Sequence, residues 1–222
     1  MKTFDDTWER LHKEIEWGKY PSEEVVRFIA RNYYSKDRKN IRVLDFGCGA
    51  GAVSWYLAKE GFDTYGFDGS ETAVNKAKAR MKQENVCANL IKADAGNLLY
   101  NEKFFDSVID SAVIYANTVE NILHILKEIN RVLKIGGKIF STGLFNDDTT
   151  GFGTGEKLGN NTYRHLTKGV LADRGTVHFF SLEEIKMMWT EAGFKNIKID
   201  KFTRTDHGGE LVIGFYIVEA EK

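Results

Sequence analysis

The sequence has little of what marks several specialised classes of protein. Two cysteines, Cys48 and Cys87, are too few for a disulfide framework and have no zinc-ligand spacing, so we expect no metal site. The 31 basic and 32 acidic residues give a formal net charge of −1, which provides no overall attraction to nucleic acid or to an anionic membrane. The composition therefore favours a small-molecule substrate and predicts no nucleic-acid partner.

Long hydrophobic runs are also absent. No stretch approaches the ~18 uninterrupted apolar residues of a membrane span, and the charged segment 1–17 lacks the apolar core of a signal peptide. We therefore expect a cytoplasmic protein with no membrane partner. The 222 residues show no shift in composition and no internal repeat, which predicts a single domain over residues 1–222. We expect this domain to be a monomer or a homodimer.

Three glycines follow a short apolar segment. Residues 43–51 read Val-Leu-Asp-Phe-Gly-Cys-Gly-Ala-Gly, and Ala52 to Lys59 has the pattern of a helix. Such a strand, glycine loop and helix bring backbone N–H groups close to a small ligand, because glycine has no Cβ and takes positive φ. The glycines also satisfy the dinucleotide pattern G-x-G-x-x-A. Asp45, at the end of the strand, would however repel a pyrophosphate and attract an ammonium group.

The segment Asp45-Phe46-Gly47-Cys48-Gly49-Ala50-Gly51 resembles the D-x-G-x-G-x-G motif of the class I S-adenosylmethionine-dependent methyltransferases. The segment 131–139 is similar to the R-V-L-x-x-G-G segment that precedes the fifth strand of that family. The resemblance covers about residues 41–142 with specific motifs and 177–219 more loosely. It implies an α/β fold with a doubly wound, seven-stranded, mostly parallel sheet, an antiparallel last strand and an N-terminal helical cap over residues 1–40.

The same resemblance implies that the cofactor is S-adenosyl-L-methionine. Asp45 would meet its methionine end, Asp68 would accept hydrogen bonds from the ribose hydroxyls, and Asp94 would accept one from the adenine amino group. A loop-capping role for Asp94 is the alternative. The cofactor-binding residues that we expect are Asp45, Gly47, Cys48, Gly49, Gly51, Asp68, Gly69, Ser70, Asp94, Ala95 and Asp110.

Catalytic and substrate-binding residues are expected near the end of the fourth strand and just before the last helix. Asp110 follows the fourth strand and should face the transferred methyl, since open parallel sheets bind ligands outside the carboxyl ends of their strands. His178 is expected to act as a general base, with an oriented structural histidine as the alternative. The predicted catalytic residues are His178 and Asp110, and the predicted substrate-binding residues are Trp17, Tyr20, Tyr115 and Arg164.

Residues 143–176 are rich in glycine and show little periodicity, which predicts an irregular insertion. We interpret it as a lid over the substrate, with surface decoration as the alternative. Its polar residues Tyr163, Arg164, His165 and Arg174 suit an anionic or polyhydroxylated substrate. His124, in the helix expected over residues 119–133, is predicted to be solvated.

The function that these patterns favour is transfer of a methyl group to an oxygen or nitrogen of a small polar metabolite or sugar-like precursor. One alternative is an NAD-dependent oxidoreductase, which would require a parallel closing strand. Residues 194–202 and 211–219 instead predict a terminal β-hairpin. The other alternative is a non-catalytic S-adenosylmethionine-binding module, which would bind the cofactor without substrate-dependent turnover.

Overall fold

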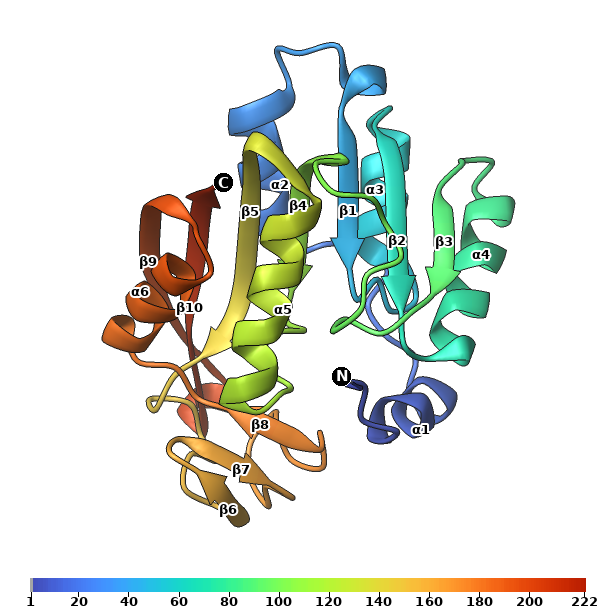
Figure 1. Cartoon of the computed structure of the whole chain (residues 1–222). Helices are drawn as coiled ribbons and strands as arrows, with labels where there is room; N and C mark the ends of the chain where they lie inside the picture. Colours follow the sequence, from blue (N-terminus) through green and yellow to red (C-terminus); the bar gives the residue numbers. More distant parts are fainter. Residues whose placement is uncertain (1) are drawn as a thin grey trace.

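The computed structural model describes residues 2–222 and is built around a seven-stranded sheet with helices on both faces (Figure 1). The strand order is β3-β2-β1-β4-β5-β10-β9. The strands are β1 (Arg42–Phe46), β2 (Asp63–Asp68), β3 (Asn89–Lys92), β4 (Phe105–Ser111), β5 (Leu133–Phe145), β9 (Lys195–Asp206) and β10 (Leu211–Glu221).

The pairing directions confirm the predicted sheet. Strands β1 to β5 pair in parallel, whereas β10 pairs antiparallel with both β5 and β9. The register places Phe46 of β1 opposite Phe67 of β2 and Asp110 of β4. The carboxyl ends of these three strands therefore lie at the same edge of the sheet, which is where open α/β sheets bind ligands.

Two apolar layers cover the sheet. The helices are α1 (Thr7–Glu14), α2 (Glu23–Tyr33), α3 (Ala52–Lys59), α4 (Glu71–Gln83), α5 (Val119–Val132) and α6 (Leu182–Glu191). One apolar cluster joins α2 and α3 to one face, and another joins α5 and α6 to the opposite face. Among residues 2–222, none of these helices has the length and apolar character needed to cross a membrane.

The two N-terminal helices have different positions. Helix α2 buries Val25, Phe28 and Ile29 against the sheet, as its apolar spacing predicts. Helix α1 lies instead beyond the carboxyl ends of the strands and contacts α4 (Figure 1). Of the residues predicted as a helical cap, α1 is therefore the part that lies near the ligand-binding edge.

The segment predicted to be irregular, residues 143–176, contributes two strands and the first residue of a third to a second, three-stranded antiparallel sheet. Its strands are β6 (Glu156–Gly159), β7 (Thr162–Arg164) and β8 (Thr176–His178), in the order β6-β7-β8. The prediction of an irregular segment is wrong here because strands of three or four residues are too short to show an alternating pattern. Helix α5 buries Ile122, Ile125, Leu126, Ile129 and Val132, whereas Leu123 is half-buried.

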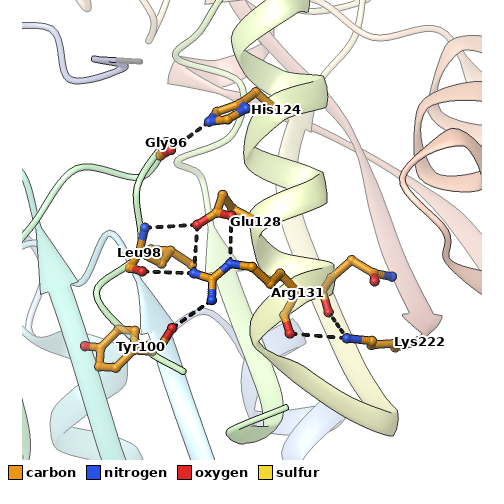
Figure 2. A network of polar contacts seen from close by, with 8 residues as sticks. Gly96, Leu98, Tyr100, His124, Glu128, Arg131 and Lys222 are labelled. Carbon is orange, nitrogen blue, oxygen red and sulfur yellow. Dashed lines mark hydrogen bonds and ion pairs between the residues drawn. The ribbon is translucent and has the colours of Figure 1, made fainter. Parts of the chain in front are cut away.

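A polar network ties α5 to the segment that follows β3 (Figure 2). Arg131 donates hydrogen bonds to the carbonyls of Leu98 (2.9 Å) and Tyr100 (2.8 Å), and also to the Glu128 carboxylate (2.8 Å). His124 Nε2 donates to the Gly96 carbonyl (2.7 Å), so the prediction of a solvated histidine is wrong. The network fixes the chain segment that carries Asp94 and Ala95 toward the carboxyl edge of the sheet.

Replacing Arg131 should loosen this segment. We expect Arg131→Met to lower the free energy of unfolding by about 1–3 kcal/mol, because two partly buried carbonyls and the Glu128 carboxylate lose their donor. Arg131→Lys should recover only part of the loss, since an ammonium cannot reproduce the planar fork. The measurement is urea unfolding followed by circular dichroism.

The control for this experiment is Arg27→Met, which removes an exposed ion pair with Glu23 on α2. Such a pair contributes about 0–1 kcal/mol. Equal losses in the Arg27 and Arg131 variants would contradict the role given to the network.

Candidate functional site

A cavity of about 480 Å³ lies at the carboxyl ends of β1, β2 and β4. Its floor is formed by the loops that follow these strands, at residues 45–49, 67–69 and 111–117. Residues 3–20, which include α1, and residues 170–174 complete the enclosure. The cavity is thus at the position that the sheet topology favours for a ligand, and its size suits a small molecule.

The glycine loop between β1 and α3 requires glycine at each of its three positions. Gly47, Gly49 and Gly51 have φ of +65°, +50° and +84°, which is the left-handed region. A Cβ on Gly47 would lie 2.6 Å from a methyl of Val113, and one on Gly51 would lie 3.0 Å from Ala77. The loop therefore places backbone against the cavity, and Gly47 and Gly49 line it whereas Gly51 does not.

Asp45 is a buried carboxyl group in the wall of the cavity. It is 2% exposed, and its Oδ2 accepts hydrogen bonds from Ser54 N (2.8 Å) and Ser54 Oγ (2.6 Å). Burial raises the pKa of Asp45 to about 7, although the two bonds from Ser54 act in the opposite direction. A cationic group of a ligand beside Asp45 would favour its ionised form.

Asp68 joins the glycine loop to the end of β2. Its two oxygens accept from Gly49 N (2.9 Å) and Ser70 N (2.8 Å), and burial raises its pKa. Asp68 and Gly69 line the cavity. Ser70 does not, because its hydroxyl caps α4 by accepting from Ala73 N (3.0 Å).

Asp94 holds the start of the chain. Its carboxylate accepts from Thr3 N (3.0 Å), Thr3 Oγ1 (2.7 Å) and Phe4 N (3.0 Å), and also from Gly96 N (2.8 Å) in its own turn. Burial, the largest single effect, raises the pKa of Asp94, but these bonds together outweigh it and the pKa is lowered. Asp94 does not line the cavity, whereas Ala95 does. The structure thus favours the alternative in which Asp94 caps its own loop, and it shows that Asp94 also anchors Thr3 and Phe4.

We call residues 2–17 the N-terminal arm. Glu9 attaches the arm to the start of α4 by accepting from Ser70 Oγ (2.6 Å) and Thr72 Oγ1 (2.7 Å), and these bonds lower the pKa of Glu9 to about 2. The ring of Phe4 lies directly against Gly69. The imidazole of His12 lies 3.4 Å from the position of a Cβ on Gly49. The arm is therefore one wall of the cavity.

Asp110 lies behind the cavity wall. It is fully buried, and its Oδ1 accepts from Val113 N (3.0 Å) and Ile114 N (3.2 Å), which fixes the turn after β4. Burial raises the pKa of Asp110 to about 7. The structure does not bring this side chain to the cavity, so its position supports shaping of residues 111–114 and no contact with a ligand.

His178 is also away from the cavity. It is fully buried on β8, where Nδ1 pairs with Thr162 Oγ1 (2.8 Å) and Nε2 with the Glu184 carboxylate (3.1 Å). Both ring nitrogens are therefore engaged between the small sheet and α6. This geometry favours the alternative of an oriented structural histidine over a general base.

The predicted substrate-binding residues divide into two groups. Trp17, Tyr20 and Tyr115 line the cavity. Arg164 instead donates to Thr176 Oγ1 (3.2 Å) within the small sheet, and Arg174 is the arginine of this segment that reaches the cavity. Lining residues that we did not predict include Thr3, Phe4, Asp5, Trp8, His12, Asn117, Phe145, Val170 and Leu171. Of these, Trp8 had a signal in the sequence, since it belongs to the apolar stripe of the first helix.

Several polar atoms of the cavity residues have no hydrogen-bond partner in the described part of the chain. His12 Nδ1, Trp17 Nε1, Asn117 Oδ1 and Arg174 Nη1 are buried and have no hydrogen-bond partner within residues 2–222. In the same part of the chain, no group of three metal-ligating side chains is assembled. Because buried polar groups are normally paired, these atoms fit an organic ligand that carries its own donors and acceptors.

The comparisons with known proteins agree with this geometry. A family model described as "Methyltransferase domain" matches residues 43–137. An uncharacterised methyltransferase of Synechocystis is 34% identical over 96 residues, 43% of each chain. A ubiquinone biosynthesis O-methyltransferase of Pelagibacter ubique is 27% identical over 122 residues, which are 55% of this chain and 50% of that protein. The chain thus spans about half the length of the first curated relatives that it matches.

Two further comparisons cover more of the chain. A demethylmenaquinone methyltransferase of Staphylococcus saprophyticus is 29% identical over 175 residues, 73% of each chain. A phosphoethanolamine N-methyltransferase of Haemonchus contortus, solved with S-adenosyl-L-methionine, has a TM-score of 0.70 at 17% identity, over 98% of this chain and 57% of that one. At that identity the structural likeness shows the fold alone.

The sheet order, the glycine loop and the cavity define an α/β protein with a Rossmann-like methyltransferase fold. Together with the family model that matches residues 43–137, they show a methyltransferase domain in this part of the chain and a likeness to the class I S-adenosylmethionine-dependent methyltransferases. S-adenosyl-L-methionine is the cofactor that this likeness implies.

The raised pKa of Asp110 predicts a pH-dependent stability. Asp110 has a pKa of about 7 in the folded protein and ~3.9 in an unfolded chain, so the folded state alone holds this proton between those values. The stabilisation is present below pH ~4 and is lost as the pH rises through 7, with a slope of up to about 1.4 kcal/mol per pH unit. We expect Asp110→Asn to flatten this decline in urea unfolding at pH 5, 6, 7 and 8.

Asp45→Asn is the matched comparison, because Asp45 has a similarly raised pKa and should contribute a separate part of the same slope. A slope that is unchanged in the Asp110 variant would show that Asp110 does not hold a proton near neutrality.

The anchoring role of Asp94 makes a second prediction. Asp94→Ala should speed hydrogen exchange of the backbone amides of Thr3 and Phe4 by about 10–100-fold, because they lose a charged acceptor. The control is Glu16→Ala in the same arm, which removes an exposed ion pair between Glu16 and Lys76 of α4. Exchange that is equally slow in the Asp94 variant and the wild type would contradict the anchor.

Proposed function

We propose that this protein is an S-adenosylmethionine-dependent methyltransferase that transfers the methyl group to an oxygen or nitrogen of a small-molecule acceptor. The observation that carries the proposal is a single cavity lined both by a glycine loop with two buried carboxyl groups, Asp45 and Asp68, and by aromatic rings. One part suits a cationic nucleoside-like cofactor, and the other offers room for an acceptor. The proposal keeps the single domain, the cytoplasmic location and the absence of nucleic-acid or membrane partners expected from the sequence.

In this proposal the residues at the ends of β1 and β2 hold the cofactor. Asp45 attracts the ammonium of the methionine end, and the backbone of Gly47 and Gly49 allows close approach. Asp68 retains lone pairs for the ribose hydroxyls, because each of its oxygens accepts one backbone N–H in the structure. Ala95 lies at the end of β3, where the adenine would be bound.

The chemistry needs little from the protein beyond position. The cofactor supplies an electrophilic methyl: its bond to the sulfonium sulfur breaks as the bond to the acceptor oxygen or nitrogen forms, and the sulfur keeps the electron pair as a neutral thioether. The chain's residues orient the acceptor and exclude water, which supplies a large share of such rate enhancements. Because His178 and Asp110 lie away from the cavity, we assign the loss of an acceptor proton to solvent before transfer.

Segment 143–176 acts as the lid in this proposal. Phe145, Val170, Leu171 and Arg174 are its contributions to the cavity wall. Support for a small organic acceptor also comes from the relatives, whose names refer to ubiquinone biosynthesis and to demethylmenaquinone. The polar or sugar-like acceptor expected from the sequence has less support, because the cavity walls are mostly apolar.

The alternative functions make different demands. An NAD-dependent oxidoreductase would need a parallel closing strand, whereas β10 is antiparallel to β5. It would also place a pyrophosphate beside the Asp45 carboxyl. A non-catalytic binding module satisfies the same cofactor geometry, and turnover is what separates it from an enzyme.

Calorimetric titration with S-adenosylmethionine, S-adenosylhomocysteine and NAD tests the cofactor. We expect micromolar binding of the first two and none of NAD. Asp45→Asn should weaken S-adenosylmethionine binding by about 1.5–3 kcal/mol, since it removes a charge-assisted hydrogen bond while conserving size. Asp63→Asn is the matched control, because Asp63 lies at the opposite end of β2 and pairs with Arg42.

Two results would count against the proposal. Binding of NAD alone would overturn the assignment of the cofactor. Binding of S-adenosylmethionine with no methylated product from any acceptor would leave the non-catalytic module as the better description.

A further inference from the structure

One part of the cavity is lined by a cluster of aromatic side chains and one arginine. We call it the acceptor chamber and define it by Trp8, Trp17, Tyr115, Phe145, Leu171 and Arg174. These residues come from the N-terminal arm, from the ends of β4 and β5, and from the lid. They therefore converge on the cavity from segments far apart in the sequence.

Aromatic rings form most of the chamber wall. The rings of Trp8 and Tyr115 meet edge to face at 6.5 Å and 82°, and those of Tyr115 and Phe145 do so at 4.9 Å and 85°. Trp17 lies 6.2 Å from Trp8. Rings held in this way offer flat faces and edges to a ligand, and such surfaces favour another flat ring. A polyhydroxylated acceptor would need many more polar partners than this wall contains.

One cation faces the chamber. The guanidinium carbon of Arg174 lies 4.8 Å from the ring centroid of Trp17, and Arg174 Nη1 is buried without a hydrogen-bond partner within residues 2–222. No carboxylate in that part of the chain lies within 4 Å of this guanidinium. The neighbouring Tyr115 is buried, which raises its pKa and keeps its hydroxyl neutral. Asp5 also lines the cavity and lies against Gly175, but it forms no ion pair with Arg174. A partly buried cation without a direct ion-pair partner is costly, so an anionic ligand group would be favoured beside it.

A second polar atom complements the cation. Asn117 Oδ1 is buried, lines the cavity and has no partner in the described residues. It is an acceptor, so it suits a hydroxyl of the same ligand. Resting on the proposed function, we infer that the methyl acceptor is a planar aromatic compound that carries an anionic oxygen, as a carboxylate or an acidic phenolate, and that Arg174 binds this oxygen.

Binding of matched aromatic probes to the protein loaded with S-adenosylhomocysteine tests the inference. The first pair is 3,4-dihydroxybenzoate and 3,4-dihydroxybenzamide, which share a shape and differ in charge. We expect the benzoate to bind at least 10-fold tighter, as a charge-assisted bond to arginine implies. The readout is quenching of tryptophan fluorescence, because Trp17 lies against Arg174. The second pair is 4-nitrocatechol, an acidic phenol, and unsubstituted catechol. Together the two pairs show whether the anionic oxygen belongs to a phenolate or to a carboxylate.

Variants at position 174 assign the effect to the residue. Arg174→Met should bring the benzoate-to-benzamide ratio close to 1, and Arg174→Lys should retain part of the preference. Arg164→Met is the matched control, because this arginine belongs to the same segment but bonds to Thr176 away from the cavity. S-adenosylhomocysteine affinity, measured in parallel, should be unchanged in all three variants.

Turnover with the same probes extends the test. With S-adenosylmethionine, the favoured anionic probe should give a product heavier by one methylene, and Arg174→Met should raise its KM by about 10–100-fold.

The outcomes separate this inference from the proposed function. Equal affinity for the charged and neutral probes, an Arg174→Met variant that keeps the preference, or tighter binding of myo-inositol than of any aromatic probe would each overturn the inference while cofactor binding stands. If the wild-type protein binds no S-adenosylmethionine or S-adenosylhomocysteine, the proposed function itself is overturned.

Discussion

The structure depends on one contact, in which the Asp68 carboxylate accepts the backbone N–H groups of Gly49 and Ser70. This pair of bonds joins the loop after β1 to the loop after β2 at the level where the parallel strands end. The loop can take this path because its glycines have positive φ and because Gly47 leaves space for Val113. The floor of the cavity, the start of α3 and the start of α4 are all set by it.

The rest of the cavity is assembled from distant parts of the chain by charged acceptors. Asp94 holds Thr3 and Phe4 across about ninety residues of sequence, and Glu9 holds the start of α4. Arg131 holds the segment behind Asp94 from the far side (Figure 2). Hydrogen bonds to charged groups are stronger than neutral ones, and here they add to the apolar contacts that Phe4, Trp8 and Leu11 make. The N-terminal arm is thus a wall of the cavity that polar and apolar contacts hold together.

The sequence was informative where local chemistry decides the structure. The glycine loop, Asp45 and Asp68 could be predicted because a strand end, a tight turn and a helix start follow one another within a few residues, and the antiparallel β10 followed from the terminal hairpin. The contacts of Thr3, the burial of His178 between Thr162 and Glu184, and the presence of Arg174 rather than Arg164 at the cavity could not be predicted. These depend on how the arm and the small sheet fold back, and neither has a periodic pattern that specifies its partner.

Unpaired polar atoms alone do not mark a binding site in this protein. Trp189 Nε1 and Asn146 Nδ2 are buried without partners in the described residues, yet neither residue lines the cavity, and Trp189 belongs to the packing of α6. Arg174 and Asn117 differ because their unpaired atoms belong to residues that line the same cavity. In the core, a buried polar group without a partner only lowers the stability of the protein. At the cavity, the same cost favours a ligand that pairs with both groups at once. The specificity of the acceptor chamber therefore follows from this coincidence of unpaired charge, flat apolar walls and access to the cofactor.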